Sequence, residues 1–103
     1  MSDWYQIKLM PDDVKEDDAH YKLKADFEAA LKGHEFDPFI AVFIGSVSLI
    51  GEVTLYVPPV VADLCESVLL QYEAFACDAP ELDDLVPGAM LVGQRGAFLD
   101  YFR

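Results

Sequence analysis

Few residues of this chain are of types that carry catalytic chemistry, and none stands in a recognisable catalytic motif. His20 and His34 are the only histidines among the 103 residues. We place His20 in the first turn of a predicted helix and His34 just after Gly33, where the helix dipole favours a histidine. No serine or cysteine occupies a Gly-x-Ser-x-Gly context, which would mark a nucleophile. We therefore predict that the protein is not an enzyme, and rank an enzyme using His20 or His34 last.

The two cysteines, Cys65 and Cys77, are predicted to be small buried hydrophobes. Both fall in a segment that we interpret as one helix, where their spacing separates them by about 18 Å along the axis and excludes a disulfide between them. No Cys-x-x-Cys motif or Cys/His cluster is present to hold a metal, so we expect no metal and no cofactor. The N-terminus lacks the basic and apolar regions of a signal peptide, so we expect an intracellular, cytoplasmic protein.

Carboxylates are abundant, but their spacing matches no known cation site. The pairs Asp12-Asp13 and Asp17-Asp18 lack the spacing and central glycine of an EF-hand loop. The segment 93–96, Gly-Gln-Arg-Gly, is flanked by glycines but is not a phosphate-binding loop, and a turn is the better interpretation.

Charge is the strongest feature of the sequence. Seven basic residues stand against 19 acidic ones, for a formal net charge of −12. A field of this sign repels phosphate, so we expect neither direct nucleic-acid binding nor docking on an anionic membrane. The charge also exceeds the magnitude of about 2–8 that serves solubility in a small domain. Solvation alone and recognition of a basic partner are therefore both open interpretations.

Two zones of the sequence carry nearly all of this charge. The first comprises Asp12, Asp13, Glu16, Asp17 and Asp18. The second comprises Asp63, Glu66, Glu73, Asp78, Glu81, Asp83 and Asp84, with no basic residue between them. We predict that all of these except Asp78 form partner-binding patches.

The N-terminal half of the chain predicts a strand followed by a helix. Residues 4–10 alternate between apolar and polar side chains, which indicates a strand. After the acidic loop, Asp17 or Asp18 is suited to cap a helix, and Gly33 to end it. Its predicted core face comprises Ala19, Leu23, Phe27, Ala30 and Leu31.

Residues 39–57 are rich in β-branched and aromatic residues and predict a hairpin. A turn at Gly45-Ser46 pairs Ile44 with Val47. A competing turn at residues 50–52 instead pairs Val47 with Leu55. The sequence leaves these two registers open.

The C-terminal half predicts a helix from Val61 to Cys77, which places Asp63, Glu66 and Glu73 on one face. A short helical piece follows and ends near Leu85, and residues 86–89 suit a type II turn. Residues 90–92 and 97–102 are predicted as short strands.

This order of elements predicts one α+β domain over residues 1–103. We expect a ferredoxin-like βαββαβ sandwich of two helices on an antiparallel sheet, with a possible extra C-terminal strand. RNA-binding modules share that fold but need basic residues on the third strand, and residues 51–57 contain none.

These features favour a non-enzymatic acidic protein that inhibits or antagonises a basic protein partner, which could be a nucleic-acid-binding protein. Phage anti-defence proteins and toxin-neutralising immunity proteins are two classes in which an acidic protein could bind a basic partner in this way. The alternative is a small-molecule-binding regulatory domain of ferredoxin-like fold that acts as a homodimer. The sequence identifies neither the partner nor the oligomeric state.

Overall fold

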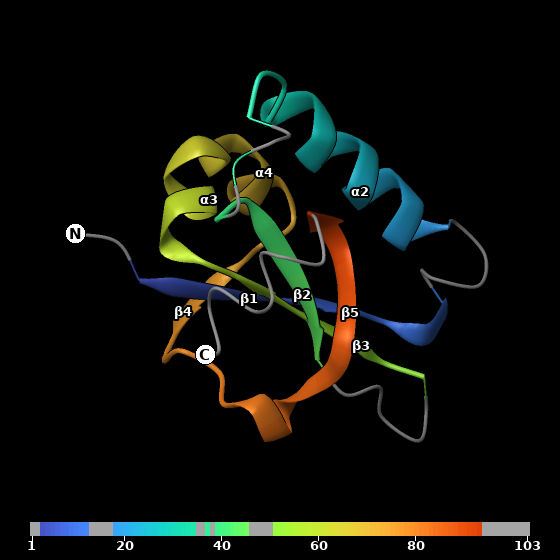
Figure 1. The fold of residues 1–103 in the computed structure, drawn as a ribbon. Coiled ribbons are helices and arrows are strands. Elements are labelled where there is room, and N and C mark those ends of the chain that lie inside the picture. Colours follow the sequence, from blue (N-terminus) through green and yellow to red (C-terminus); the bar gives the residue numbers. More distant parts are fainter. Residues whose placement is uncertain (1–2, 13–17, 35–36, 38, 46–50, 94–103) are drawn as a thin grey trace.

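Over the residues described below, the fold is α+β, with helices packed against an antiparallel sheet (Figure 1). The computed structural model describes residues 3–12, 18–34, 37, 39–45 and 51–93, without the side chains of residues 82, 87 and 88. The described strands form one five-stranded sheet in the order β4-β1-β3-β2-β5, with every neighbouring pair antiparallel. No described helix is long and apolar enough to cross a membrane.

The first strand and helix follow their predicted positions. β1 spans Trp4–Leu9 and α2 spans Ala19–Ala30. Leu23, Phe27 and Leu31 are buried as expected, whereas Ala30 is exposed. Asp18 is the N-cap residue of α2, but it acts through its carbonyl oxygen, which accepts hydrogen bonds from the backbone N–H groups of Tyr21 and Lys22.

Both predicted hairpin registers are wrong. β2 spans Ala41–Gly45 and β3 spans Val53–Val57, and their register pairs Ile44 with Leu55. Gly45 is needed for space: a Cβ there would lie 2.9 Å from the ring of Tyr56 and 3.1 Å from the carbonyl oxygen of Thr54. Residues 46–50 lie outside the described part of the chain.

The single helix predicted from Val61 to Cys77 is also wrong. α3 spans Pro59–Leu64, α4 spans Glu66–Gln71, and β4 spans Phe75–Cys77. Glu73 has a φ of 56°, a left-handed conformation that no α-helix continues through. β4 pairs with β1, so tertiary pairing overrides the helical periodicity of this segment.

The predicted turn at residues 86–89 lies inside a strand. A short 3₁₀ helix, η1, spans Leu82–Asp84, close to the predicted helical piece, and β5 then spans Leu85–Gly93. Between the pairs Gly45–Leu85 and Phe43–Met90, β2 has one residue and β5 has four. Pro87 and Gly88 therefore produce a bulge, because proline cannot donate to a ladder and is tolerated there. Residues 90–92 are in a strand as predicted, and residues 97–102 lie outside the described residues.

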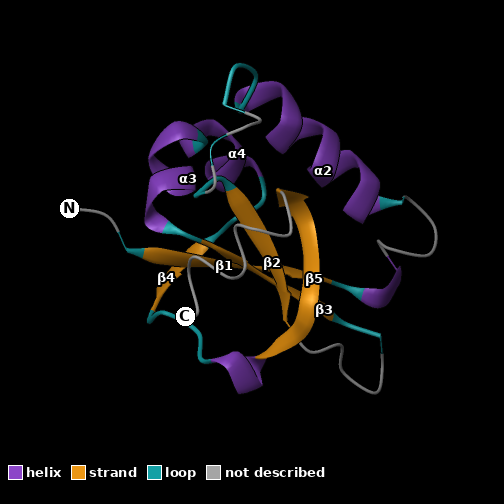
Figure 2. Ribbon diagram, in the orientation of Figure 1, coloured by secondary structure: helices purple, strands orange, loops and turns teal. Residues whose placement is uncertain are grey.

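The sheet carries two apolar clusters, one on each face. Helices α2, α3 and α4 cover one face (Figure 2), where Ile7, Val42, Leu55 and Phe27 belong to the main core. The opposite face carries a smaller cluster of Ala41, Phe43 and Leu85, with Trp4, Tyr56 and Met90 packed against it. The rings of Trp4 and Phe43 stack with their centroids 6.0 Å apart.

The strand order departs from the predicted four-stranded sandwich. The last strand of that sandwich would pair with β1, and the three-residue strand β4 takes this place instead of residues 90–92. β5 lies on the other side of the sheet, beside β2. A sheet with β5 added beyond β2 is not the standard βαββαβ arrangement.

Candidate functional site

Asp78 of the second acidic zone and Asp12 of the first lie toward opposite ends of β1. Asp3 and Asp78 flank the paired residues Trp4 and Cys77 at the start of that strand. Asp12 follows its other end, at least six residues away, and a strand of that length spans about 20 Å. Asp18 begins α2 on the same far side. Asp78 therefore lies far from Asp12 and Asp18.

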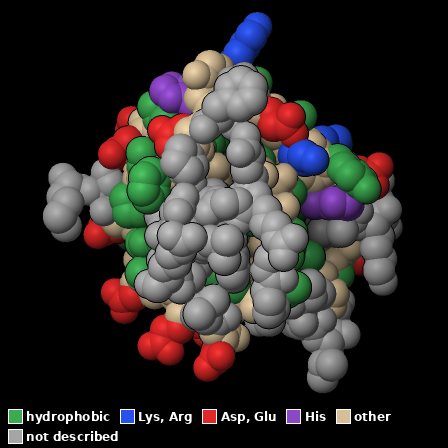
Figure 3. Space-filling view, in the orientation of Figure 1, with side chains coloured by type: hydrophobic (Ala, Val, Ile, Leu, Met, Phe, Trp, Pro, Cys, Tyr) green, Lys and Arg blue, Asp and Glu red, His purple; other side chains and the backbone are tan. Residues whose placement is uncertain are grey.

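An acidic flank runs from α3 past the start of β1 to η1. We define it by its members: Asp3, Asp63, Glu66, Asp78, Glu81, Asp83 and Asp84, all of which are exposed. In the space-filling view acidic side chains gather along the side that carries α3 and along the edge that carries η1 (Figure 3). The four described cations lie elsewhere: Lys22, Lys24 and Lys32 on or directly after α2, and Lys8 near the far end of β1.

Apolar side chains are exposed beside these carboxylates. Leu64 is 40% exposed at the end of α3, and Val86 is 38% exposed directly after η1. Leu70 is 76% exposed and lies one helical turn from Glu66 on α4. The acidic flank thus combines a carboxylate rim with apolar anchors, a pairing typical of protein interfaces.

The η1 end of the flank is held by local backbone contacts. The backbone N–H of Glu81 donates a 3.0 Å hydrogen bond to Oδ2 of Asp84, and the N–H of Asp84 donates a 2.9 Å bond to the carbonyl oxygen of Glu81. Close packing on β2 fixes the same turn, because a Cβ on Gly45 would lie 3.3 Å from the carbonyl oxygen of Asp84. Glu81, Asp83 and Asp84 are therefore presented on a defined turn.

The electrostatic effect of the flank is seen at Cys77. Partial burial raises the pKa of the Cys77 thiol, and the charges of Asp78 and Asp3 raise it further. Burial alone raises the pKa of the Cys65 thiol to about 11. Neither thiol has the depressed pKa of a reactive cysteine. Both cysteines are free, as predicted, and Cys65 is fully buried, whereas Cys77 is only partly buried.

The remaining predicted site residues do not join the acidic flank. Glu73 follows α4 and lines a hollow together with Lys8 and Lys22, so the expected face of Asp63, Glu66 and Glu73 does not exist. Asp13, Glu16 and Asp17 lie outside the described residues.

The two histidines do not share a site. His20 lies at one end of the helical stretch from His20 to Ala30 and His34 lies beyond the other, and the ten steps of this stretch span about 15 Å along the axis of α2. His20 packs on Tyr21, with 4.1 Å between their ring centroids. Within the described ranges, no group of three or more His, Cys, Asp or Glu side chains is placed to hold a metal ion.

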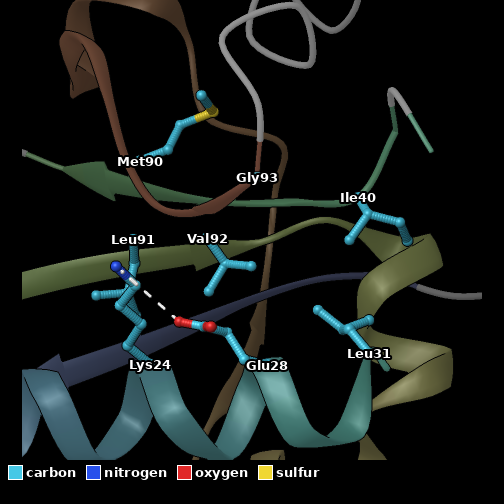
Figure 4. A pocket seen from close by; sticks show the side chains of 8 residues that line it. All are labelled: Lys24, Glu28, Leu31, Ile40, Met90, Leu91, Val92 and Gly93. Atoms are coloured by element: carbon cyan, nitrogen blue, oxygen red, sulfur yellow. Dashed lines mark ion pairs between the residues drawn. The ribbon is translucent and has the colours of Figure 1, made fainter. Parts of the chain in front are cut away.

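A hollow of about 420 Å³ lies between α2 and β5 (Figure 4). Leu31, Ile40 and Val92 form its apolar walls, and Lys24 and Glu28 lie along α2 at its rim. The Lys24 Nζ and Glu28 Oε1 atoms are 4.0 Å apart, so the cation of this hollow already faces a carboxylate. The one lysine that lines this hollow is therefore already opposed by a carboxylate, and the hollow offers little to orient a charged ligand.

Sequence reasoning missed several components of the flank. Asp3 lies far in sequence from the second acidic zone and joins it only because β4 pairs with β1. One continuous helix from Val61 to Cys77 would place Leu64 on its apolar face, whereas Leu64 is exposed at the end of α3. A break between Leu64 and Glu66 changes which side of each short helix faces the sheet.

Comparison with known proteins adds no relative. No protein-family model, no curated protein sequence and no solved structure matches this chain.

Proposed function

We propose that this protein is a non-enzymatic antagonist that docks its acidic flank onto a basic, nucleic-acid-binding protein. The observation that carries this proposal is the segregation of charge. Seven carboxylates lie on the flank, and the described lysines lie on α2, shortly after it, or near the far end of β1. Clustered carboxylates repel one another and cost folding stability, so their retention on one flank favours a role in recognition.

The proposed mechanism is occupation of a phosphate-binding surface. Carboxylates at the rim would meet the lysines and arginines that otherwise contact phosphates, and their field would accelerate encounter with a basic partner. The exposed Leu64, Leu70 and Val86 would supply apolar contacts that phosphates cannot offer. Such contacts would make binding less sensitive to salt than purely electrostatic docking.

Two finer features belong to the same proposal. We take β1 to β4 with α2, α3 and α4 as a ferredoxin-like unit, because β3 lies between β1 and β2 and β1 lies between β3 and β4. β5 is then an added strand. The two free cysteines fit a reducing compartment, which supports action in the cytoplasm.

The test compares two charge-reversal variants of equal net charge. Asp78→Lys with Asp83→Lys alters the acidic flank, whereas Asp12→Lys with Glu28→Lys makes the same change of charge elsewhere. Each tagged protein and the wild type are used to capture partners from host lysate at low and at physiological salt. The captured protein is then purified and titrated with nucleic acid in the presence of each variant.

The expected result is a partner that wild type and the Asp12/Glu28 variant retain and that the flank variant loses. Nucleic acid should compete with wild type for that partner. A partner retained equally by both variants would overturn the placement on the flank. A partner whose binding to nucleic acid is unaffected by saturating wild type would overturn the antagonist mechanism.

A further inference from the structure

A hollow of about 540 Å³ opens where β1 ends and β4 begins, away from the acidic flank. β1 and the residue after it contribute Lys8, Leu9 and Met10 to its lining, and the start of α2 contributes Ala19 and Lys22. The rest of the lining runs from the end of α4 into β4: Gln71, Tyr72, Glu73 and Phe75. Three separate segments of the chain thus converge on one concave site, and its volume is in the range of small-molecule pockets.

The net charge of the residues that line this hollow has the opposite sign to the charge of the whole protein. Two of the four described lysines, Lys8 and Lys22, line it, and Glu73 is the one acidic side chain among the lining residues. Neither lysine forms an ion pair with another described residue. The lining is therefore net cationic in a chain whose formal charge is −12.

The hollow also exposes apolar surface beside its cations. Phe75 is 46% exposed and Met10 is 49% exposed, and Lys8 Nζ lies 6.0 Å from the centre of the Phe75 ring. An anion bound to Lys8 would place its attached carbon atoms against the Phe75 ring. Covering this apolar surface is favourable at roughly 25 cal/mol per Å².

We propose that this hollow binds a small organic monoanion that carries one carboxylate on an apolar, preferably aromatic, body. Lys8 and Lys22 hold the carboxylate, and Phe75 and Met10 cover the body. The proposal is independent of the acidic flank, because no member of the flank lines this hollow. It gives this chain a ligand site that the antagonist function does not require.

Glu73 explains why the ligand is a monoanion. The backbone of Glu73 is in the left-handed conformation, and two hydrogen bonds hold it there. The N–H of Ala74 donates a 2.9 Å bond to the carbonyl oxygen of Leu69. The N–H of Glu73 donates a 3.4 Å bond to the carbonyl oxygen of Leu70. Glu73 lines the hollow, so its carboxylate repels a second negative charge there. Replacing Glu73 should therefore strengthen the binding of any anion.

The experiment titrates the full chain with three probes of one shape. These are 3-phenylpropionate, 3-phenylpropanol and 3-phenylpropylamine, which carry a negative, a neutral and a positive head group. NMR chemical shifts of the Met10 methyl and Phe75 ring report binding at the hollow. A ligand of about 11 heavy atoms is expected to bind with a Kd of the order of 1 mM. The variants are Lys8→Gln, Lys22→Gln and Glu73→Gln, with Lys32→Gln as a matched control at the other end of α2.

The expected order is propionate first, then propanol, then propylamine. Lys8→Gln and Lys22→Gln should each weaken propionate binding about tenfold, Lys32→Gln should leave it unchanged, and Glu73→Gln should tighten it about twofold to threefold. Because a merely structural effect would weaken all three probes alike, the neutral probe checks that each variant keeps its hollow. No binding of propionate at 20 mM, or equal binding of the three probes, would overturn the proposal.

Discussion

The hydroxyl of Tyr72 donates a 2.6 Å hydrogen bond to Oδ2 of Asp26, and this bond joins the end of α4 to the middle of α2. The two residues are 46 positions apart, and both side chains are only partly exposed. Lys22 lies four residues before Asp26 in α2, a spacing that would also allow an ion pair. Asp26 accepts the tertiary hydrogen bond from Tyr72 instead, because an exposed i,i+4 ion pair contributes only a few tenths of a kcal/mol.

Loss of this bond should be measurable as a loss of stability. We expect Tyr72→Phe to lower the free energy of unfolding by about 1–2 kcal/mol, because it removes a hydrogen bond to a carboxylate and little volume. Chemical denaturation measures it, and Asp26→Asn with the double variant completes a mutant cycle. A cycle with no coupling between the two residues would show that the bond does not stabilise the fold.

The same pair should make stability depend on alkaline pH. Burial, the hydrogen bond to Asp26 and the negative charge of Asp26 together raise the pKa of Tyr72 from 10.0 to about 12. A raised pKa stabilises the protonated form of the folded state, so this contribution is complete below pH 10 and is lost as the pH rises through 12. The stability difference between wild type and Tyr72→Phe should therefore shrink over this range. A difference that is constant up to pH 12 would contradict the assignment.

Cys77 offers a direct probe of the acidic flank. We expect Asp78→Asn to lower the pKa of the Cys77 thiol, because one of the charges that raise it is removed. The rate of alkylation by iodoacetamide at pH 8 should then rise about twofold, since the thiolate is the reacting species. Peptide mass spectrometry separates Cys77 from the buried Cys65. Asp12→Asn makes the same charge change at the far end of β1, and an equal acceleration by that control would contradict a local effect.

The sequence predicted local features better than tertiary ones. β1 and α2 were predictable because their apolar residues repeat with a clear period over a full element. The segment after Val57 was not, because the short helices and β4 all carry apolar residues at spacings that one long helix also satisfies. Strand pairing distinguishes β4 from the helices, because β4 pairs with the outer edge of β1. The local sequence of residues 75–77 does not predict that contact. The sequence shows which residues are acidic, but their division between the acidic flank, the far end of β1 and the hollow depends on the same tertiary contacts.

The stability of the turn at η1 should depend on the side chain of Asp84 but not on that of its neighbour Asp83. Asp84 accepts a hydrogen bond from the backbone N–H of Glu81, whereas Asp83 is exposed and adds only charge. We expect Asp84→Ala to lower the free energy of unfolding by about 1 kcal/mol. Asp83→Ala should leave it unchanged or raise it slightly, because it relieves repulsion within the flank. Equal effects of the two variants in denaturant titrations would show that the side chain of Asp84 does not hold the turn.

Two glycines with similar backbone angles should respond differently to alanine. Gly33 has a φ of +96° and Gly93 a φ of +113°, so alanine is strained at both positions. At Gly33 a Cβ meets nothing within 4 Å, and the expected cost is about 1 kcal/mol of conformational strain. At Gly93 a Cβ would lie 2.6 Å from the carbonyl oxygen of Ile40 and 2.9 Å from Cα of Ala41, so the end of β5 must move away from β2. Gly93→Ala should therefore cost about 2–3 kcal/mol more than Gly33→Ala, and it should increase hydrogen exchange at Val92. If the two variants are equally stable, β5 does not pack on β2 as closely as this structure shows.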